Sequence, residues 1–102
     1  MFSQTPSISP SELSAKVAEG WRIVDVRTDD EWAQGHLEGT IHIPMDQVVA
    51  RLDEIGDQVI CLCAVGARSE RVAQYLAAQG REAVNLDGGI YALADAGFPI
   101  VG

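Results

Sequence analysis

Two cysteines, Cys61 and Cys63, are the residues of this sequence best suited to covalent chemistry, because a deprotonated thiol is a strong nucleophile. They lie two positions apart in the apolar run 58–63, so on a β-strand their side chains would point to the same face. A disulfide between them would be strained, and two cysteines are too few for a disulfide framework, so we expect both thiols to be reduced. Most cysteines are small buried apolar residues, and Cys61, between Ile60 and Leu62, is expected to be one of them.

The position of Cys63 favours a reactive thiolate. It ends the apolar run and is followed by the small residues 64–67 and by a predicted helix over 68–79. The free N–H groups and the dipole of a helix start both stabilise a thiolate, so the pKa of Cys63 should fall below its usual value of about 8.5. Small side chains let backbone amides curl around an anion, and Arg68 and Arg71 follow directly.

The remaining elements must place this residue, and they alternate between strands and helices. Apolar runs and capping residues predict strands over 21–26, 40–43, 58–63 and 82–86, and helices between Ser9 and Gly20, over 29–34, from Asp46 towards Leu52, over 68–79 and over 90–96. Such alternation requires a parallel sheet with crossover helices. Ligands of these sheets bind beyond the carboxyl ends of the strands, where Cys63 ends the strand expected to be most central.

We therefore expect a small three-layer α/β domain, with a central parallel sheet of four to five strands flanked by helices. It should span residues 1–102 as one domain, with a core at about 9–101. The chain is 47% hydrophobic, with no stretch near the roughly 20 apolar residues of a membrane span. The N-terminus has no basic segment followed by an apolar one, which favours a cytoplasmic location. The net charge of −8 argues against nucleic acid and anionic membranes as partners.

Several segments together resemble the signatures of the rhodanese family, in order and spacing, from about residue 9 to residue 101. They are Val24-Asp25-Val26-Arg27, Glu31-Trp32, Gly35-His36-Leu37-Glu38-Gly39-Thr40-Ile41-His42-Ile43-Pro44, the loop Cys63-Ala64-Val65-Gly66-Ala67-Arg68-Ser69, Leu86-Asp87-Gly88-Gly89, and Gly97-Phe98-Pro99. Each segment alone is a weak signal, but the combination is highly specific.

The resemblance implies a rhodanese-type sulfurtransferase, of the thiosulfate:cyanide class, that needs no cofactor. In that family the cysteine, here Cys63, takes the outer sulfur of a donor such as thiosulfate and becomes a persulfide. Cyanide or a thiol then accepts the sulfur, so this is covalent catalysis by double displacement. By the same resemblance, the backbone N–H groups of the loop stabilise the bound anion and the persulfide; the loop residues are Ala64, Val65, Gly66, Ala67, Arg68 and Ser69.

The other signature residues are expected to support the site. Asp25, Arg27 and Glu31 are close enough in sequence for an ion-pair or capping network beneath it. His36 and His42 lack further ligand-type neighbours, so no metal site is expected. The two glycines at 88–89 are expected to allow close packing of a strand end against the last helix.

One departure from the family puts thiosulfate in doubt as the donor. Ala64 and Val65 occupy positions where the better-known thiosulfate enzymes often carry basic residues, and the net charge of −8 opposes a small dianion. A persulfide is then the more attractive donor, with a cysteine desulfurase or a thioredoxin-like protein as candidate partners.

Two other functions stay open. A phosphatase or arsenate reductase is disfavoured, because the four residues between Cys63 and Arg68 are one fewer than in related phosphatase loops. A non-catalytic binding or regulatory module is disfavoured because inactive members of the family usually lack the cysteine, and this sequence has it as Cys63.

Overall fold

A five-stranded parallel sheet forms the framework of the computed structural model, which describes residues 5–102. The strand order across the sheet is β1 (Ser7–Ile8), β6 (Glu82–Leu86), β5 (Gln58–Leu62), β2 (Arg22–Asp25) and β4 (Ile41–His42). The predicted parallel α/β sheet is thus confirmed, with β5 at its centre. A separate antiparallel pair joins β3 (His36–Leu37) to β7 (Ile100–Val101).

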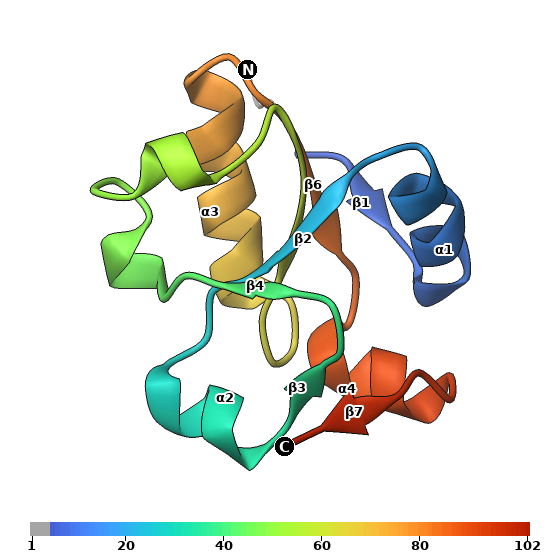
Figure 1. The fold of residues 1–102 in the computed structure, drawn as a ribbon. Coiled ribbons are helices and arrows are strands. Elements are labelled where there is room, and N and C mark those ends of the chain that lie inside the picture. The colour runs from blue at the N-terminus through green and yellow to red at the C-terminus, as the bar shows by residue number, and fades with distance from the viewer. Residues whose placement is uncertain (1–4) are drawn as a thin grey trace.

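Helices cover both faces of the sheet, as Figure 1 shows, with α3 on one side and α1 on the other. The helices are α1 (Pro10–Ala18), α2 (Asp29–Gln34), α3 (Ala67–Ala78) and α4 (Gly89–Asp95). Because side chains alternate along a strand, β5 feeds two separate cores. Cys61 and Cys63 join the core that includes Val72 and Leu76 of α3, whereas Ile60 and Leu62 pack with residues of α1 and α4.

The end of the molecule beyond the carboxyl ends of β2, β5 and β6 gathers α2, α4 and the β3–β7 pair (Figure 1). The register aligns Cys61 with Val24 of β2 and Asn85 of β6, so the residues that follow these positions meet at one edge. The Val26 N–H continues the ladder by donating to the Leu62 carbonyl at 2.9 Å. The strands therefore deliver Cys63 to the place where such sheets bind ligands.

Two parts of the structure differ from the elements predicted. The prediction of a helix from Asp46 towards Leu52 is wrong, because the structure has two 3-10 turns there, Met45–Gln47 and Leu52–Glu54. Their bonds span three residues, as from the Gln47 N–H to the Pro44 carbonyl at 2.8 Å. Asp46 does not cap a helix here, and neither turn has the side-chain N-cap hydrogen bond that Thr28 gives to α2, so an α-helix is not favoured. Strands β1, β3 and β7 were not predicted, since two residues are too few to show periodicity. Within residues 5–102, no helix is long and apolar enough to cross a membrane.

Candidate functional site

The loop between β5 and α3 turns back on the Cys63 sulfur. The Gly66 N–H donates a hydrogen bond to Cys63 Sγ at 3.1 Å, and the Ser69 hydroxyl oxygen lies within hydrogen-bond distance of the same sulfur, at 3.2 Å. Gly66 has a φ of +106°, in the left-handed region that favours glycine, and it caps the start of α3. The small residues of the loop thus let the helix start face the sulfur, as the sequence pattern suggests.

The two thiols differ in acidity. Burial raises the pKa of Cys63, but hydrogen bonds from the Ser69 hydroxyl and from the backbone amides of Ser69, Gly66 and Val65 outweigh it, so the net pKa is lowered. Burial, together with the nearby Cys63, raises the pKa of Cys61 to about 12. Cys61 is fully buried among apolar neighbours, as expected, and Cys63 is the thiol that ionises more readily.

The start of α4 holds the backbone of Cys63 and Ala64 in place. The Ile90 N–H donates to the Cys63 carbonyl at 2.9 Å, and the Tyr91 N–H donates to the Ala64 carbonyl at 3.4 Å. Gly89 lies beside them with a φ of +64°, and a Cβ there would stand 2.6 Å from the Cys63 carbonyl oxygen and still closer to that of Ala64. Only glycine allows this close approach of α4 to the loop.

A buried ion pair lies at the end of β2. Asp25 and Arg27 are 0% and 5% exposed, and the Arg27 Nη2 donates to Asp25 Oδ2 at 2.8 Å. The Arg27 Nε also donates to Asp25, at 3.0 Å, and Nη1 and Nη2 donate to the carbonyls of Glu31 at 3.3 Å and Gly35 at 2.8 Å. These contacts satisfy both buried charges and tie the strand end to α2, beside the Cys63 loop.

Glu31 of α2 pairs with Arg68, which lies in the first turn of α3. The Arg68 Nη1 and Nη2 donate to Glu31 Oε1 and Oε2 at 2.8 and 2.9 Å, a two-pronged ion pair. The Arg68 hydrogen bonds outweigh burial, helped by those from Thr28, and lower the pKa of Glu31 to about 2. The positive charge that the sequence places at the head of α3 is thus balanced by a carboxylate.

Replacement of Glu31 by glutamine tests this ion pair through its pH dependence. Since the folded protein lowers the pKa of Glu31 from 4.5 to about 2, the pair stabilises the fold above pH 4.5 and loses this effect as the pH falls towards 2. We expect a loss of about 1 kcal/mol in the free energy of unfolding at pH 6, measured by urea denaturation. The loss should shrink below pH 4.5, whereas a constant difference down to pH 2 would contradict the pairing. Replacement of the exposed Glu38 by glutamine controls for the lost charge.

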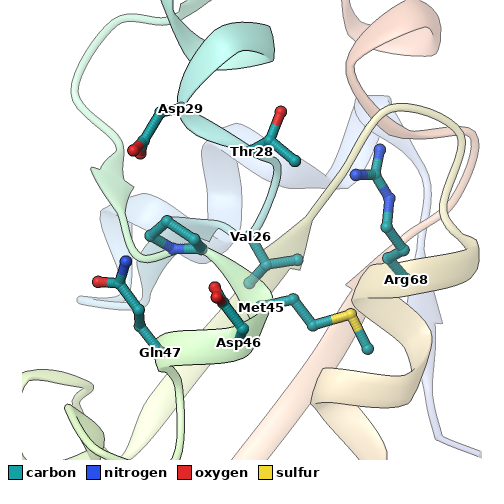
Figure 2. Close-up of a pocket in the computed structure, with 8 residues that line it drawn as sticks. Val26, Thr28, Asp29, Met45, Asp46, Gln47 and Arg68 are labelled. Atoms are coloured by element: carbon teal, nitrogen blue, oxygen red, sulfur yellow. The ribbon is translucent and has the colours of Figure 1, made fainter.

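Two pockets flank the loop. A pocket of about 350 Å³ is lined by Arg68 together with two carboxylates, Asp29 and Asp46. Figure 2 shows Arg68 entering it from one side and Asp29 and Gln47 from the other. A second pocket, of about 230 Å³, is lined by Ala64, Arg27, Glu31 and residues of α4 that include the exposed Tyr91. The Glu31–Arg68 pair stands between the pockets, since each is lined by one of its members.

Most residues singled out from the sequence meet at this edge of the sheet. Of the predicted loop, Val65, Gly66 and Ser69 face the Cys63 sulfur. Asp25 and Arg27 lie at the end of β2, and Glu31 forms an ion pair with Arg68. Within residues 5–102, no three His, Cys, Asp or Glu side chains are gathered closely enough to hold a metal ion. His36 and His42 instead stack on the ring of Trp32, with ring centroids 3.7 and 4.6 Å apart.

Sequence reasoning missed Asn85, a buried polar residue near the carboxyl end of β6. Its Oδ1 accepts from the Ser69 hydroxyl at 2.5 Å, and its Nδ2 donates to the Gly66 carbonyl at 3.1 Å. The signal in the sequence is a single amide in the otherwise apolar run Ala83-Val84-Asn85-Leu86. A buried polar side chain in a strand needs a partner, and here both partners belong to the Cys63 loop.

Comparison with known proteins finds relatives that are named as rhodanese-like domains or sulfurtransferases. A family model described as "Rhodanese-like domain" matches residues 9–96. The chain is 40% identical over 99 residues to a sulfurtransferase of Allochromatium vinosum, covering 92% of each. It is 33% identical over 91 residues to the thiosulfate sulfurtransferase GlpE of Pseudomonas entomophila, covering 86% of this chain and 84% of that one. The solved structure of a rhodanese-like domain protein from Staphylococcus aureus is similar with a TM-score of 0.82 at 39% identity, covering 96% of this chain and 100% of the other.

Proposed function

The chain belongs to the family of rhodanese-like domains, and we propose that it moves a sulfane sulfur from a donor to a thiol acceptor through a persulfide on Cys63. One observation carries this proposal: Cys63 directly follows the central strand β5, and its sulfur lies within hydrogen-bond distance of the Gly66 N–H and the Ser69 hydroxyl. Such donors favour a thiolate over a thiol, and a thiolate is the attacking species in sulfur transfer.

The reaction consists of two displacements at sulfur. The Cys63 thiolate attacks the outer sulfur of the donor; a new S–S bond forms, and the donor's own S–S bond breaks with its electron pair leaving on the donor remnant. The thiolate of the acceptor then attacks the outer sulfur of the Cys63 persulfide. The bond to Cys63 Sγ breaks, the electron pair returns to Cys63, and the Gly66 and Ser69 donors receive the restored negative charge.

The charges around the site favour a persulfide over thiosulfate as donor. Arg68 is paired with Glu31, and the larger flanking pocket adds the carboxylates of Asp29 and Asp46. With a net charge of −8 the protein also repels a small dianion as it approaches. A persulfide carried by a protein such as a cysteine desulfurase, or by a small thiol, brings less negative charge to the loop.

Steady-state kinetics with the two kinds of donor test this preference. We expect a KM for thiosulfate above about 1 mM, the upper end of the usual range, with cyanide as acceptor. Loading from a cysteine desulfurase supplied with cysteine should reach completion at micromolar protein concentrations. A sub-millimolar KM for thiosulfate, with no loading from the desulfurase, would reverse the assignment of the donor and leave Cys63 as the carrier.

A further inference from the structure

The Ser69 hydroxyl has one hydrogen to donate and three acceptors around it. Its Oγ lies 3.2 Å from Cys63 Sγ, 3.3 Å from the Gly66 carbonyl oxygen and 2.5 Å from Asn85 Oδ1. Ser69 is fully buried and Asn85 is 4% exposed, so water is poorly placed to supply a second donor. At any moment only one of these acceptors receives a full hydrogen bond from Ser69.

The orientation of the Asn85 amide is set by Gly66. A backbone carbonyl only accepts hydrogen bonds, so the group of Asn85 that lies 3.1 Å from the Gly66 oxygen must be its NH₂. The Oδ1 atom therefore faces Ser69, and at 2.5 Å the two oxygens need a hydrogen between them. In this arrangement Ser69 donates to Asn85 and can only accept a hydrogen bond from an uncharged Cys63 thiol.

Ionisation of Cys63 changes this balance. A thiolate carries no hydrogen and demands donors, and the Ser69 hydroxyl is the side-chain donor beside it. If the hydrogen turns to the sulfur, Asn85 Oδ1 loses its partner while buried, which is unfavourable. The same amide also fixes the Gly66 peptide, whose N–H is the other donor to the sulfur.

We propose that Asn85 is a positioning residue of this site, which holds the Ser69 hydroxyl hydrogen while the Cys63 sulfur is uncharged and yields it to the sulfur when Cys63 becomes a thiolate. The inference rests on the proposed function, in which Cys63 alternates between a persulfide, whose inner sulfur is uncharged, and a thiolate. As the persulfide S–S bond breaks and negative charge returns to Sγ, the hydrogen turns from Asn85 to the sulfur. Through Asn85, the hydrogen bond made by the Ser69 hydroxyl thus depends on the charge of the Cys63 sulfur.

Other ionisable groups lie on the elements packed around Cys63. They are Cys61 on β5 and Arg68 on α3, with Glu31 of α2 and Asp25 of β2 acting on Arg68, and Tyr91 of α4 beside Ala64. The variants used below change none of them. Their contributions therefore cancel when variants are compared with one another.

The test is a cycle of four proteins: the natural chain, Asn85→Leu, Ser69→Ala and the double variant. The rate of alkylation by iodoacetamide is measured against pH, and intact mass counts the alkyl groups. Leucine removes the competing acceptor, which frees the Ser69 hydrogen for the sulfur, but it also removes the bond to Gly66. In the Ser69→Ala background, Asn85→Leu removes only the hydrogen bond to Gly66. The shift of the apparent Cys63 pKa in the natural chain minus the shift in this background therefore measures the effect of the Ser69 hydrogen for which Asn85 and the sulfur compete.

We expect Asn85→Leu to lower the apparent pKa of Cys63 by at least about 0.5 unit more in the natural chain than in the Ser69→Ala background. Equal shifts in the two backgrounds would overturn the proposal, because a purely structural role of Asn85 acts regardless of the Ser69 hydroxyl. Asn85→Ala, which also lacks the acceptor, provides a second cycle if the leucine variant fails to fold. Alkylation needs no sulfur donor, so failure of this proposal is distinguishable from failure of sulfur transfer: equal shifts leave loading of Cys63 intact.

Discussion

Replacement of Cys63 by serine is expected to abolish sulfur transfer, lowering the turnover rate by about a thousandfold or more. A serine hydroxyl is not ionised at neutral pH and cannot form a persulfide, so both displacement steps lose their nucleophile. The hydrogen bonds from the Gly66 N–H and the Ser69 hydroxyl can still reach an oxygen at this position, so the loop should keep its shape. Turnover from a persulfide donor to a thiol acceptor is the measurement.

The matched control for this variant is Cys61→Ala. Cys61 lies in β5, two residues before Cys63, and joins the same core, but burial raises its pKa to about 12. Its removal should reduce stability, through a small cavity, by about 1 kcal/mol and leave turnover within a few fold. Loss of turnover in Cys61→Ala with retention in Cys63→Ser would reverse the assignment of the two thiols.

Replacement of Gly89 by alanine is expected to damage the site more than any other change outside Cys63. The new Cβ would lie within 2.6 Å of the Cys63 carbonyl oxygen and would also collide with the Ala64 carbonyl, so α4 and the loop must move apart. The Ile90 N–H then loses its bond to the Cys63 carbonyl. We expect at least about a hundredfold loss of turnover, since small misplacements at a reacting centre have effects of this size.

Gly97→Ala separates this clash from backbone strain. Gly97 also has a positive φ, +90°, but a Cβ there would meet nothing within 4 Å. Both variants should lose about 1–3 kcal/mol of unfolding free energy from the strained backbone alone, measured by urea denaturation. Turnover should fall in Gly89→Ala only. Equal losses of turnover in the two variants would mean that the contact of α4 with the Cys63 loop is unimportant.

The parts of the fold that the sequence predicted are those with a local signature. The apolar run 58–63 and the alternation of strands and helices indicated a parallel sheet with this run at its centre. A capping residue before the predicted helix 29–34 indicated the start of α2; it is Thr28, whose hydroxyl accepts a hydrogen bond from the Glu31 N–H at 3.3 Å. Strands β1, β3 and β7 and the 3-10 turns escaped prediction because these segments of two or three residues carry no periodicity, whereas β4 lies within the predicted strand 40–43.

Contacts between distant segments were beyond sequence reasoning. Glu31 and Arg68 are 37 positions apart, and nothing local indicates that they form an ion pair. The sequence places the cation of Arg68 at the head of α3, and only the structure shows the carboxylate that balances it. The close packing expected at the two glycines 88–89 is present at Gly89, but its partners, the carbonyls of Cys63 and Ala64, became known only from the structure.

The central claim, that Cys63 carries the transferred sulfur, is tested most directly by intact mass after incubation with a persulfide donor, here a cysteine desulfurase with cysteine. We predict a gain of one sulfur atom in the natural chain and in Cys61→Ala, reversed by a thiol acceptor, and no gain in Cys63→Ser. A sulfur gain that persists in Cys63→Ser, or that disappears in Cys61→Ala while that variant remains folded, would contradict the account.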